Sequence, residues 1–263
     1  MINLDIDHAA RVAEQAAYAA GTHLLASRAR LAETLVTGRD PAQVVDQIAR
    51  EGAALVRGIV ARNFPEHGFC AATDSPVYPH RHAQWFADAL DGQANYLRGG
   101  APYAVTLALV VDGEPHLGVV YDPQRNEFFG ALRGRGAVLN GAPIRCDSSR
   151  PAQDAVVATV MPRSTHPGMA ACIAEVGRVA QRFGSVRRSV SRALEMAHLA
   201  AGRIDAFWGH DLDRRNAAAG IVLLRESGAR VESRDAAPLL LSRSMFACTP
   251  RLHGSFAALL GEA

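Results

Sequence analysis

The chain has 263 residues, 49% of them hydrophobic, which is enough for one large domain or two closely packed halves. Its formal net charge is only +2, and acidic and basic residues are interspersed, so neither a nucleic-acid-binding stripe nor a polybasic membrane segment is predicted. All 28 basic residues are arginines, which excludes a lysine Schiff base, a lysine general base and the phosphate-binding lysine of a Walker motif.

The four cysteines are far apart in the sequence and form no Cys-x-x-Cys pair. This spacing predicts reduced thiols in a cytoplasmic protein rather than a zinc site or a disulfide framework. Residues 1–8 lack a basic region followed by an apolar core, so we expect no signal peptide, and no apolar run is long enough to predict a membrane-spanning helix.

Two long helices are predicted near the N-terminus, because apolar residues recur at helical spacing over residues 7–30 and 41–63. Pro41 is compatible with the first turn of the second helix. A strand at 68–71 then leads into an irregular loop at 74–82, which is rich in proline and histidine.

Antiparallel strands are predicted next, over residues 103–111, 115–121 and 127–132. Asp112-Gly113 lies between the first two apolar runs and is typical of a hairpin turn. Asn140-Gly141 marks another tight turn.

The second half of the chain alternates strands with helices, and no repeat or long linker divides it. We expect strands at 155–160, 183–186, 204–208, about 230 and 244–247, and helices at 168–180, 191–201, 215–227 and the C-terminus. This order of elements indicates a layered α/β architecture. We expect one unit over residues 1–263, with approximate halves at 1–150 and 151–263.

Residues 85–96 stand out as a candidate site. Asp88 and Asp91 lie three residues apart where a short strand, 85–87, gives way to a glycine-containing turn. Two neighbouring carboxylates are costly unless a cation joins them, and with the backbone carbonyl of Leu90 they supply the oxygen ligands that Mg²⁺ prefers.

The turn after these carboxylates is a candidate phosphate site. If a helical turn starts after Gly92, the backbone N–H groups of Gln93 and Ala94 would face a bound phosphate. The alternative is that Asp-x-x-Asp-Gly is ordinary turn chemistry, in which aspartate caps backbone donors and glycine supplies a positive φ.

Residues 85–96 resemble the signature Trp-x-x-Asp-Pro-(Ile/Leu)-Asp-Gly-Thr-x-Asn-(Phe/Tyr) of the inositol monophosphatase family of Mg²⁺-dependent phosphatases. The resemblance runs from about residue 10 to residue 250, with further matches in the same order at 118–123, 134–141, 191–205 and 219–228. It implies a five-layered αβαβα sandwich, commonly a homodimer, that hydrolyses inositol phosphate or a similar small phosphate.

The same resemblance implies a depleted metal site. Where active members have a glutamate that binds metal and orients the attacking water, this chain has Ala72, and Gln93 replaces a threonine that polarises the water. The position of the third metal-binding aspartate carries Asn216, and that of the substrate-side acid carries Gly209. Because Mg²⁺ affinity depends on charged oxygen ligands, we expect weak or absent binding and strongly reduced or absent phosphatase activity.

Two loops could instead rebuild a metal site of different composition, since both should lie near the central turn. Asp74, His80, His82 and His210 are the candidates, with Asp211 and Asp213 beside them. Imidazole ligands would favour Zn²⁺, Mn²⁺ or Ni²⁺ over Mg²⁺. The alternative is that these histidines are solvated loop residues.

Arginines are dense around the expected substrate position, and Arg192 replaces a small residue of the matched helix. The others are Arg187, Arg188, Arg214 and Arg215. Guanidinium groups bind phosphate or carboxylate without a metal, although they also serve simply as solubilising surface groups.

Two functional hypotheses follow. The chain is a Mg²⁺-dependent phosphomonoesterase with impaired activity, or it is an inactive pseudo-phosphatase that binds an anion or a protein partner. Either would take a small phosphorylated or otherwise anionic ligand, and neither predicts a nucleic-acid or membrane partner.

Overall fold

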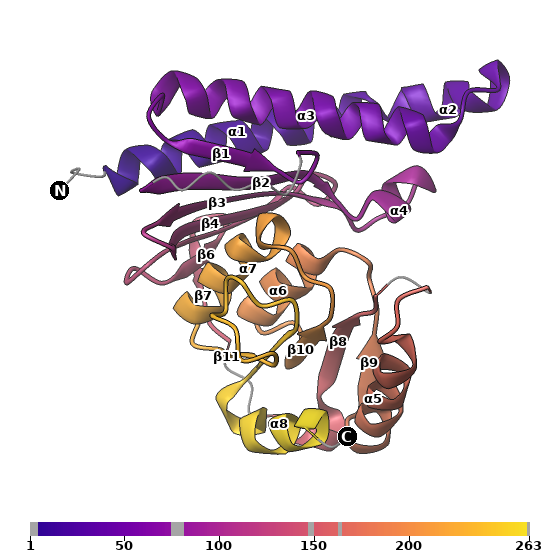
Figure 1. Cartoon of the computed structure of the whole chain (residues 1–263), viewed down its shortest axis with the longest axis vertical. Coiled ribbons are helices and arrows are strands. Elements are labelled where there is room, and N and C mark those ends of the chain that lie inside the picture. The colour runs from indigo at the N-terminus through magenta and orange to yellow at the C-terminus, as the bar shows by residue number, and fades with distance from the viewer. Residues whose placement is uncertain (1–4, 75–81, 147–149, 163–164, 262–263) are drawn as a thin grey trace.

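The computed structural model of the chain describes residues 5–74, 82–146, 150–162 and 165–261. The described elements form five layers: helices, a seven-stranded sheet, two helices, a five-stranded sheet and two outer helices (Figure 1). This is the predicted αβαβα sandwich.

The first layer consists of the N-terminal helices, α1 (Ile6–Ala26), α2 (Arg28–Thr37) and α3 (Pro41–Asn63). Asp5 caps α1 by accepting a hydrogen bond from the His8 N–H, and Asp40 caps α3, which has Pro41 in its first turn. A single helix over 7–30 was predicted, but α1 ends at Ala26 and α2 begins at Arg28. The i→i−4 bonding is interrupted there, because the Arg30 N–H donates to the Ser27 carbonyl three residues back.

The seven-stranded sheet lies beneath these helices, and its strands follow one another in chain order. They are β1 (Gly68–Ala71), β2 (Ala83–Asp91), β3 (Ala104–Val111), β4 (Glu114–Asp122), β5 (Glu127–Leu132), β6 (Ala137–Leu139) and β7 (Ala142–Ile144). Only the β1–β2 pair is parallel. The strand predicted at 85–87 is longer, since β2 is buried along its whole length between β1 and β3.

The five-stranded sheet has the order β11-β12-β10-β8-β9. Its strands are β8 (Val156–Val160), β9 (Ser185–Arg187), β10 (Ala206–Gly209), β11 (Arg230–Ser233) and β12 (Met245–Cys248). Between the two sheets lie α6 (Arg192–Ala200) and α7 (Arg214–Glu226), while α5 (Met169–Arg182) and α8 (His253–Gly261) cover the outer face. The remaining helices are α4 (Gln93–Leu97) and two short 3₁₀ turns, Ala152–Asp154 and Pro250–Leu252.

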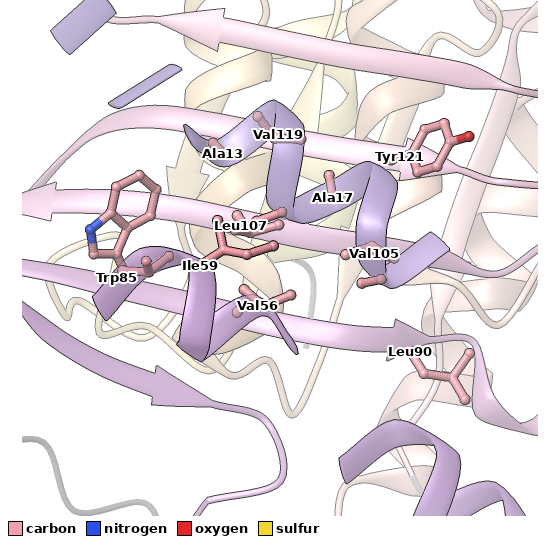
Figure 2. Close-up of a cluster of buried hydrophobic side chains, with 14 of the residues drawn as sticks. Ala13, Ala17, Val56, Ile59, Trp85, Leu90, Val105, Leu107, Val119 and Tyr121 are labelled. Carbon is pink, nitrogen blue, oxygen red and sulfur yellow. The ribbon is translucent and has the colours of Figure 1, made fainter. Parts of the chain in front are cut away.

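Apolar side chains fill each interface between layers. Figure 2 shows the first interface, where Ala13 and Ala17 of α1 lie over the sheet near Val105 and Val119. On the other face of the sheet, Gly118 of β4 lies so close to α7 that an added Cβ would be 2.4 Å from the Ala219 carbonyl oxygen. Such small residues let α1 and α7 approach the sheet closely, which fixes the position of the start of α7 relative to the end of β2.

Among the described residues, no helix is long and apolar enough to cross a membrane.

Candidate active site

A cavity of about 350 Å³ opens where β2 ends and where α4, α6 and α7 begin. The residues predicted for the site all line this cavity: Asp88, Leu90, Asp91, Gly92, Gln93, Ala94, Arg192 and Asn216. Ala72, Val190, Asp213 and Arg215 also line it. The structure therefore brings together residues that are more than 100 positions apart in the chain.

The end of β2 is irregular in a way that turns both carboxylates towards the cavity. Pairing with β3 shifts between Asp88 and Asp91, and the Leu90 N–H donates to Asp88 Oδ1 at 3.0 Å. Gly92 follows with a φ of 91°, and a Cβ there would lie 2.8 Å from the Pro102 carbonyl oxygen. Only glycine suits this close, left-handed turn.

Asp91 ties the end of β2 to the start of α6. Its Oδ2 accepts hydrogen bonds from the Ser191 hydroxyl at 2.6 Å and from the Ala193 N–H at 2.9 Å. Ser191 also caps α6, since its Oγ accepts a hydrogen bond from the Leu194 N–H. These bonds fix the orientation of the Asp91 carboxylate at the wall of the cavity.

The two aspartates form a buried acidic pair, with exposures of 8% for Asp88 and 3% for Asp91. Burial raises the pKa of Asp88 to about 7, and the neighbouring charge of Asp91 adds to the effect. Burial also raises the pKa of Asp91, although the Ser191 hydrogen bond opposes this. The charge of Arg192 lowers both pKa values and that of Arg215 lowers the pKa of Asp88, but they do not cancel the effect of burial, so the pair is still electrostatically unsatisfied without a cation.

Asn216, in the first turn of α7, is the third oxygen ligand that the site offers. Its side chain is 8% exposed, and its buried Oδ1 has no hydrogen-bond partner. A buried acceptor left unpaired costs about 1–3 kcal/mol. Asn216 Oδ1, the Leu90 carbonyl and the two carboxylates fit one divalent cation, whereas the methyl group of Ala72 offers no ligand.

Asp74 does not replace the missing glutamate. Its carboxylate accepts two hydrogen bonds from Arg57 of α3 and one from the Ala71 N–H. Arg215 holds the same loop by donating to the Asp74 backbone carbonyl at 2.8 Å. Its guanidinium also forms a bidentate ion pair with Asp213. The loop is held in place with Asp74 turned away from the cavity.

The histidines considered for a rebuilt metal site also lie elsewhere. His82 pairs with Asp112, His210 pairs with Glu175, and neither lines the cavity. His80 lies outside the described residues. The hypothesis of a histidine-containing metal site at the central turn therefore gains no support from the described residues.

Cys172, Glu175 and His210 form a separate cluster in which one ligand atom from each lies within 4.8 Å of the others. The Glu175 oxygens already accept hydrogen bonds from Trp208, His210 and Arg234. This cluster is a satisfied ion-pair network between α5 and the end of β10, away from the acidic pair.

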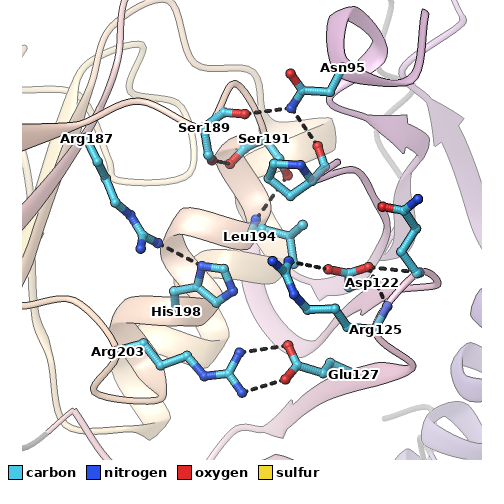
Figure 3. A network of polar contacts seen from close by, with 12 residues as sticks. Asn95, Asp122, Arg125, Glu127, Arg187, Ser189, Ser191, Leu194, His198 and Arg203 are labelled. Carbon is cyan, nitrogen blue, oxygen red and sulfur yellow. Dashed lines mark hydrogen bonds and ion pairs between the residues drawn. The ribbon is translucent and has the colours of Figure 1, made fainter. Parts of the chain in front are cut away.

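The predicted arginine cluster divides into two groups. Arg192 and Arg215 line the cavity, and the buried Nε of Arg192 has no hydrogen-bond partner. Arg187 instead donates to Glu195 and contacts His198, as Figure 3 shows for the histidine, while Arg214 lies over the ring of Phe86.

Sequence reasoning missed two features of the site. Val190 has a φ of 76°, which is rare for a β-branched residue, and it lines the cavity beside Arg192. Arg243, from the loop before β12, lines an adjoining cavity that also holds Arg188. No local sequence pattern marks either residue, because both positions depend on how the layers meet.

Comparison with known proteins identifies the family. The model of the inositol monophosphatase family matches residues 5–263. The chain belongs to this family. It is 32% identical to an inositol-1-monophosphatase of Rhizobium meliloti over 215 residues, 81% of each chain. It is 34% identical over 194 residues to Nus factor SuhB of Escherichia coli K12, covering 71% of this chain and 70% of the relative.

Solved structures agree with this membership. The inositol monophosphatase of Anabaena has a TM-score of 0.86 at 27% identity, with 98% of this chain and 96% of that chain covered. Mycobacterium tuberculosis SuhB has a TM-score of 0.81 at 25% identity, with 97% and 96% covered. Both the resemblance and the sandwich fold inferred from the sequence are thereby confirmed, and the chain is a member of a phosphatase family.

Proposed function

We propose that the cavity binds a small phosphate monoester, such as an inositol phosphate, beside a single divalent cation, and that its hydrolysis is strongly impaired. The observation that carries this proposal is the buried Asp88–Asp91 pair facing the unpaired Oδ1 of Asn216. Negative and neutral oxygens around one polar cavity favour a small hard cation such as Mg²⁺.

Asp88, Asp91, Asn216 Oδ1 and the carbonyl of Leu90 would hold the cation. When bound, it would supply positive charge for the phosphate oxygens and lower the pKa of a water molecule. Two carboxylates in place of the family's fuller acidic set hold Mg²⁺ weakly, since its hydration shell is lost reluctantly.

The phosphate would lie against the start of α4. The amides of Gln93 and Ala94 are in the first turn, where backbone N–H groups have no partner within the helix. The free Nε of Arg192 gives a second, charged donor from the opposite side of the cavity.

Three substitutions support impaired turnover. Ala72 cannot hold or orient an attacking water, and Asn216 contributes a neutral oxygen. Gln93 can hydrogen-bond to water but cannot relay a proton as a hydroxyl group does.

A pseudo-phosphatase that binds an anion or a protein partner is the second candidate. Two observations favour it. Arg215 donates to the Asp74 carbonyl and so holds the loop that would carry the missing glutamate, and Arg192 can bind an anion without a metal. Several relatives carry the name Nus factor rather than a phosphatase name, which makes a binding role for this chain a reasonable second proposal.

A reversion experiment separates the two candidates. Ala72→Glu, Gln93→Thr and Asn216→Asp together should raise Mg²⁺-dependent phosphate release from inositol 1-phosphate by about 100-fold or more over the unaltered chain. The same triple variant with Asp88→Asn is the matched control and should lose that gain. If the triple variant folds and binds Mg²⁺ but hydrolyses no faster, the enzymatic proposal is wrong and the binding role is favoured.

The family resemblance also supports a homodimer, and the four free, buried cysteines are compatible with a cytoplasmic location. Light scattering on the purified protein would test the dimer.

A further inference from the structure

We propose that a second cavity beside the site binds a second anionic group of the ligand, so that the preferred ligand is a phosphate monoester that also carries a carboxylate or another phosphate. This inference rests on the proposed function, because it assumes that the first cavity takes the phosphate monoester. The second cavity has a volume of about 480 Å³.

The two cavities are continuous. Ala94, Val190, Arg192, Asp213 and Asn216 line both of them. A ligand whose phosphate lies near the start of α4 would therefore place the rest of its structure directly in the second cavity. The far wall consists of Val160, the last residue of β8, and of Met161 and Pro162 after it; it is largely apolar.

Positive charge exceeds negative charge in the second cavity. Arg188, Arg192, Arg215 and Arg243 face two acids, Asp211 and Asp213. Both acids are already engaged, since Arg243 pairs with Asp211 and Arg215 pairs with Asp213. Among the described residues, neither Arg188 nor Arg192 forms an ion pair with a carboxylate, although the charge of Arg192 also acts on Asp88 and Asp91, so both guanidinium groups have donors for a ligand.

Arg192 is the better defined of these two groups. Its Nε is buried and has no hydrogen-bond partner, although its residue lines both cavities. Because a buried charged donor without an acceptor is costly, the phosphate oxygen proposed to lie at this Nε would relieve the cost. The other nitrogens of the same guanidinium would then donate to the second anionic group. Arg188, four positions earlier, is exposed and can complete the contact from the rim.

The segment between these arginines is fixed in a strained conformation. Val190 has a φ of 76°, and such backbone persists only where its surroundings hold it, which occurs often at ligand clamps. The Asn95 side chain donates to the carbonyl of Ser189 at 2.7 Å (Figure 3). The Ser191 hydroxyl donates to Asp91. The segment is thus anchored to both α4 and the acidic pair, so Arg188 and Arg192 are presented from a rigid support.

This chemistry suits an anion better than a neutral polyol. A sugar or inositol ring needs acceptors for its hydroxyl protons, and the two acids that line the cavity are occupied by arginines. Guanidinium groups without partners bind carboxylate or phosphate with two parallel hydrogen bonds.

A pair of ligands that differ in one group tests the proposal. Glycerol 3-phosphate and 3-phosphoglycerate share the phosphate monoester and differ only in a CH₂OH or a carboxylate. We expect 3-phosphoglycerate to bind the protein about tenfold more tightly or better in calorimetric titrations with Mg²⁺ present, since hydrogen bonds to charged groups are individually strong.

Two variants with the same change of charge identify the source of this preference. Arg188→Gln should reduce the ratio of the two affinities to about threefold or less, and Arg182→Gln, on the exposed end of α5, should leave it unchanged. Equal affinity of the unaltered protein for the two ligands would overturn the second subsite while leaving the proposed function intact. Binding of neither ligand would overturn the proposed function and this inference with it.

Discussion

The acidic pair should destabilise the metal-free protein, so removing one of its charges should stabilise the fold. Asp88→Asn keeps the size of the side chain and the acceptor for the Leu90 N–H but eliminates the buried charge. The expected result is unusual for a buried polar group: the variant should be more stable than the unaltered chain and less able to bind Mg²⁺.

The magnitude follows from the pKa of Asp88. Raising this pKa from 3.8 to about 7 by burial and by the Asp91 charge corresponds to about 4 kcal/mol of lost stability once the group is fully ionised. The neutral amide accepts a weaker hydrogen bond from the Leu90 N–H, which offsets part of the gain. We therefore expect Asp88→Asn to raise the free energy of unfolding by about 2 kcal/mol, or the Tm by about 4–8 °C.

The pH dependence has a definite sign. The folded-state pKa of Asp88 lies above its unfolded value, so the unaltered protein loses stability as the pH rises from about 4 through 7. The advantage of Asp88→Asn should be greatest above pH 7 and should shrink as the pH falls towards 4. Urea unfolding at pH 8 and pH 5, in the presence of a chelator, measures both values.

Asp122→Asn is the matched control. Asp122 is fully buried, but it accepts hydrogen bonds from the Gln124 and Arg125 N–H groups and pairs with the Arg125 side chain. The same chemical change should destabilise the protein there by about 2 kcal/mol. If Asp88→Asn is as destabilising as Asp122→Asn at pH 8, the acidic pair is not electrostatically unsatisfied and the reasoning fails.

Three further substitutions test interactions elsewhere in the fold. Burial opposes ionisation of Glu175, but hydrogen bonds from His210 and Arg234 lower its pKa from 4.5 to about 2, so Glu175→Gln should cost about 3 kcal/mol at pH 7 in urea unfolding. That contribution is present above pH 4.5 and is lost as the pH falls through 2; an equal cost at pH 2 would contradict it. Gly118→Ala should lower stability by about 2 kcal/mol because its Cβ would meet the Ala219 carbonyl, and a neutral result would mean that α7 lies farther from β4. Tyr96→Phe, which removes a buried hydrogen bond to the Leu24 carbonyl, should cost about 1 kcal/mol, and no change in Tm would rule out that bond.

Local patterns were sufficient to predict most of the fold. The helix over 41–63 was predicted with its observed bounds, because Pro41 and the apolar spacing mark its start and its buried face. The hairpin at Asp112-Gly113 and the strand at 127–132 were also confirmed. Boundaries were less accurate where packing decides them, as at Ser27, which ends α1 without a glycine or proline.

That the candidate site residues line one cavity could be predicted because a dense motif carries most of them. Asp88, Leu90 and Asp91 lie within four residues, and the family resemblance located Asn216 by its distance from Glu226. The partners of Asp74 could not be predicted in the same way. Arg57 and Arg215 come from different layers, and their contacts with the 71–74 loop depend on how α3 and α7 dock onto the sheet.

The depleted cation site is the central claim, and calorimetric titration of the metal-stripped protein with Mg²⁺ tests it most directly, with and without inositol 1-phosphate. We expect dissociation constants in the millimolar range, about 4 kcal/mol of binding free energy, tightened by the phosphate ester and tightened further in Asn216→Asp. Micromolar binding of Mg²⁺ by the unaltered chain, equal to that of the triple variant, would contradict the claim.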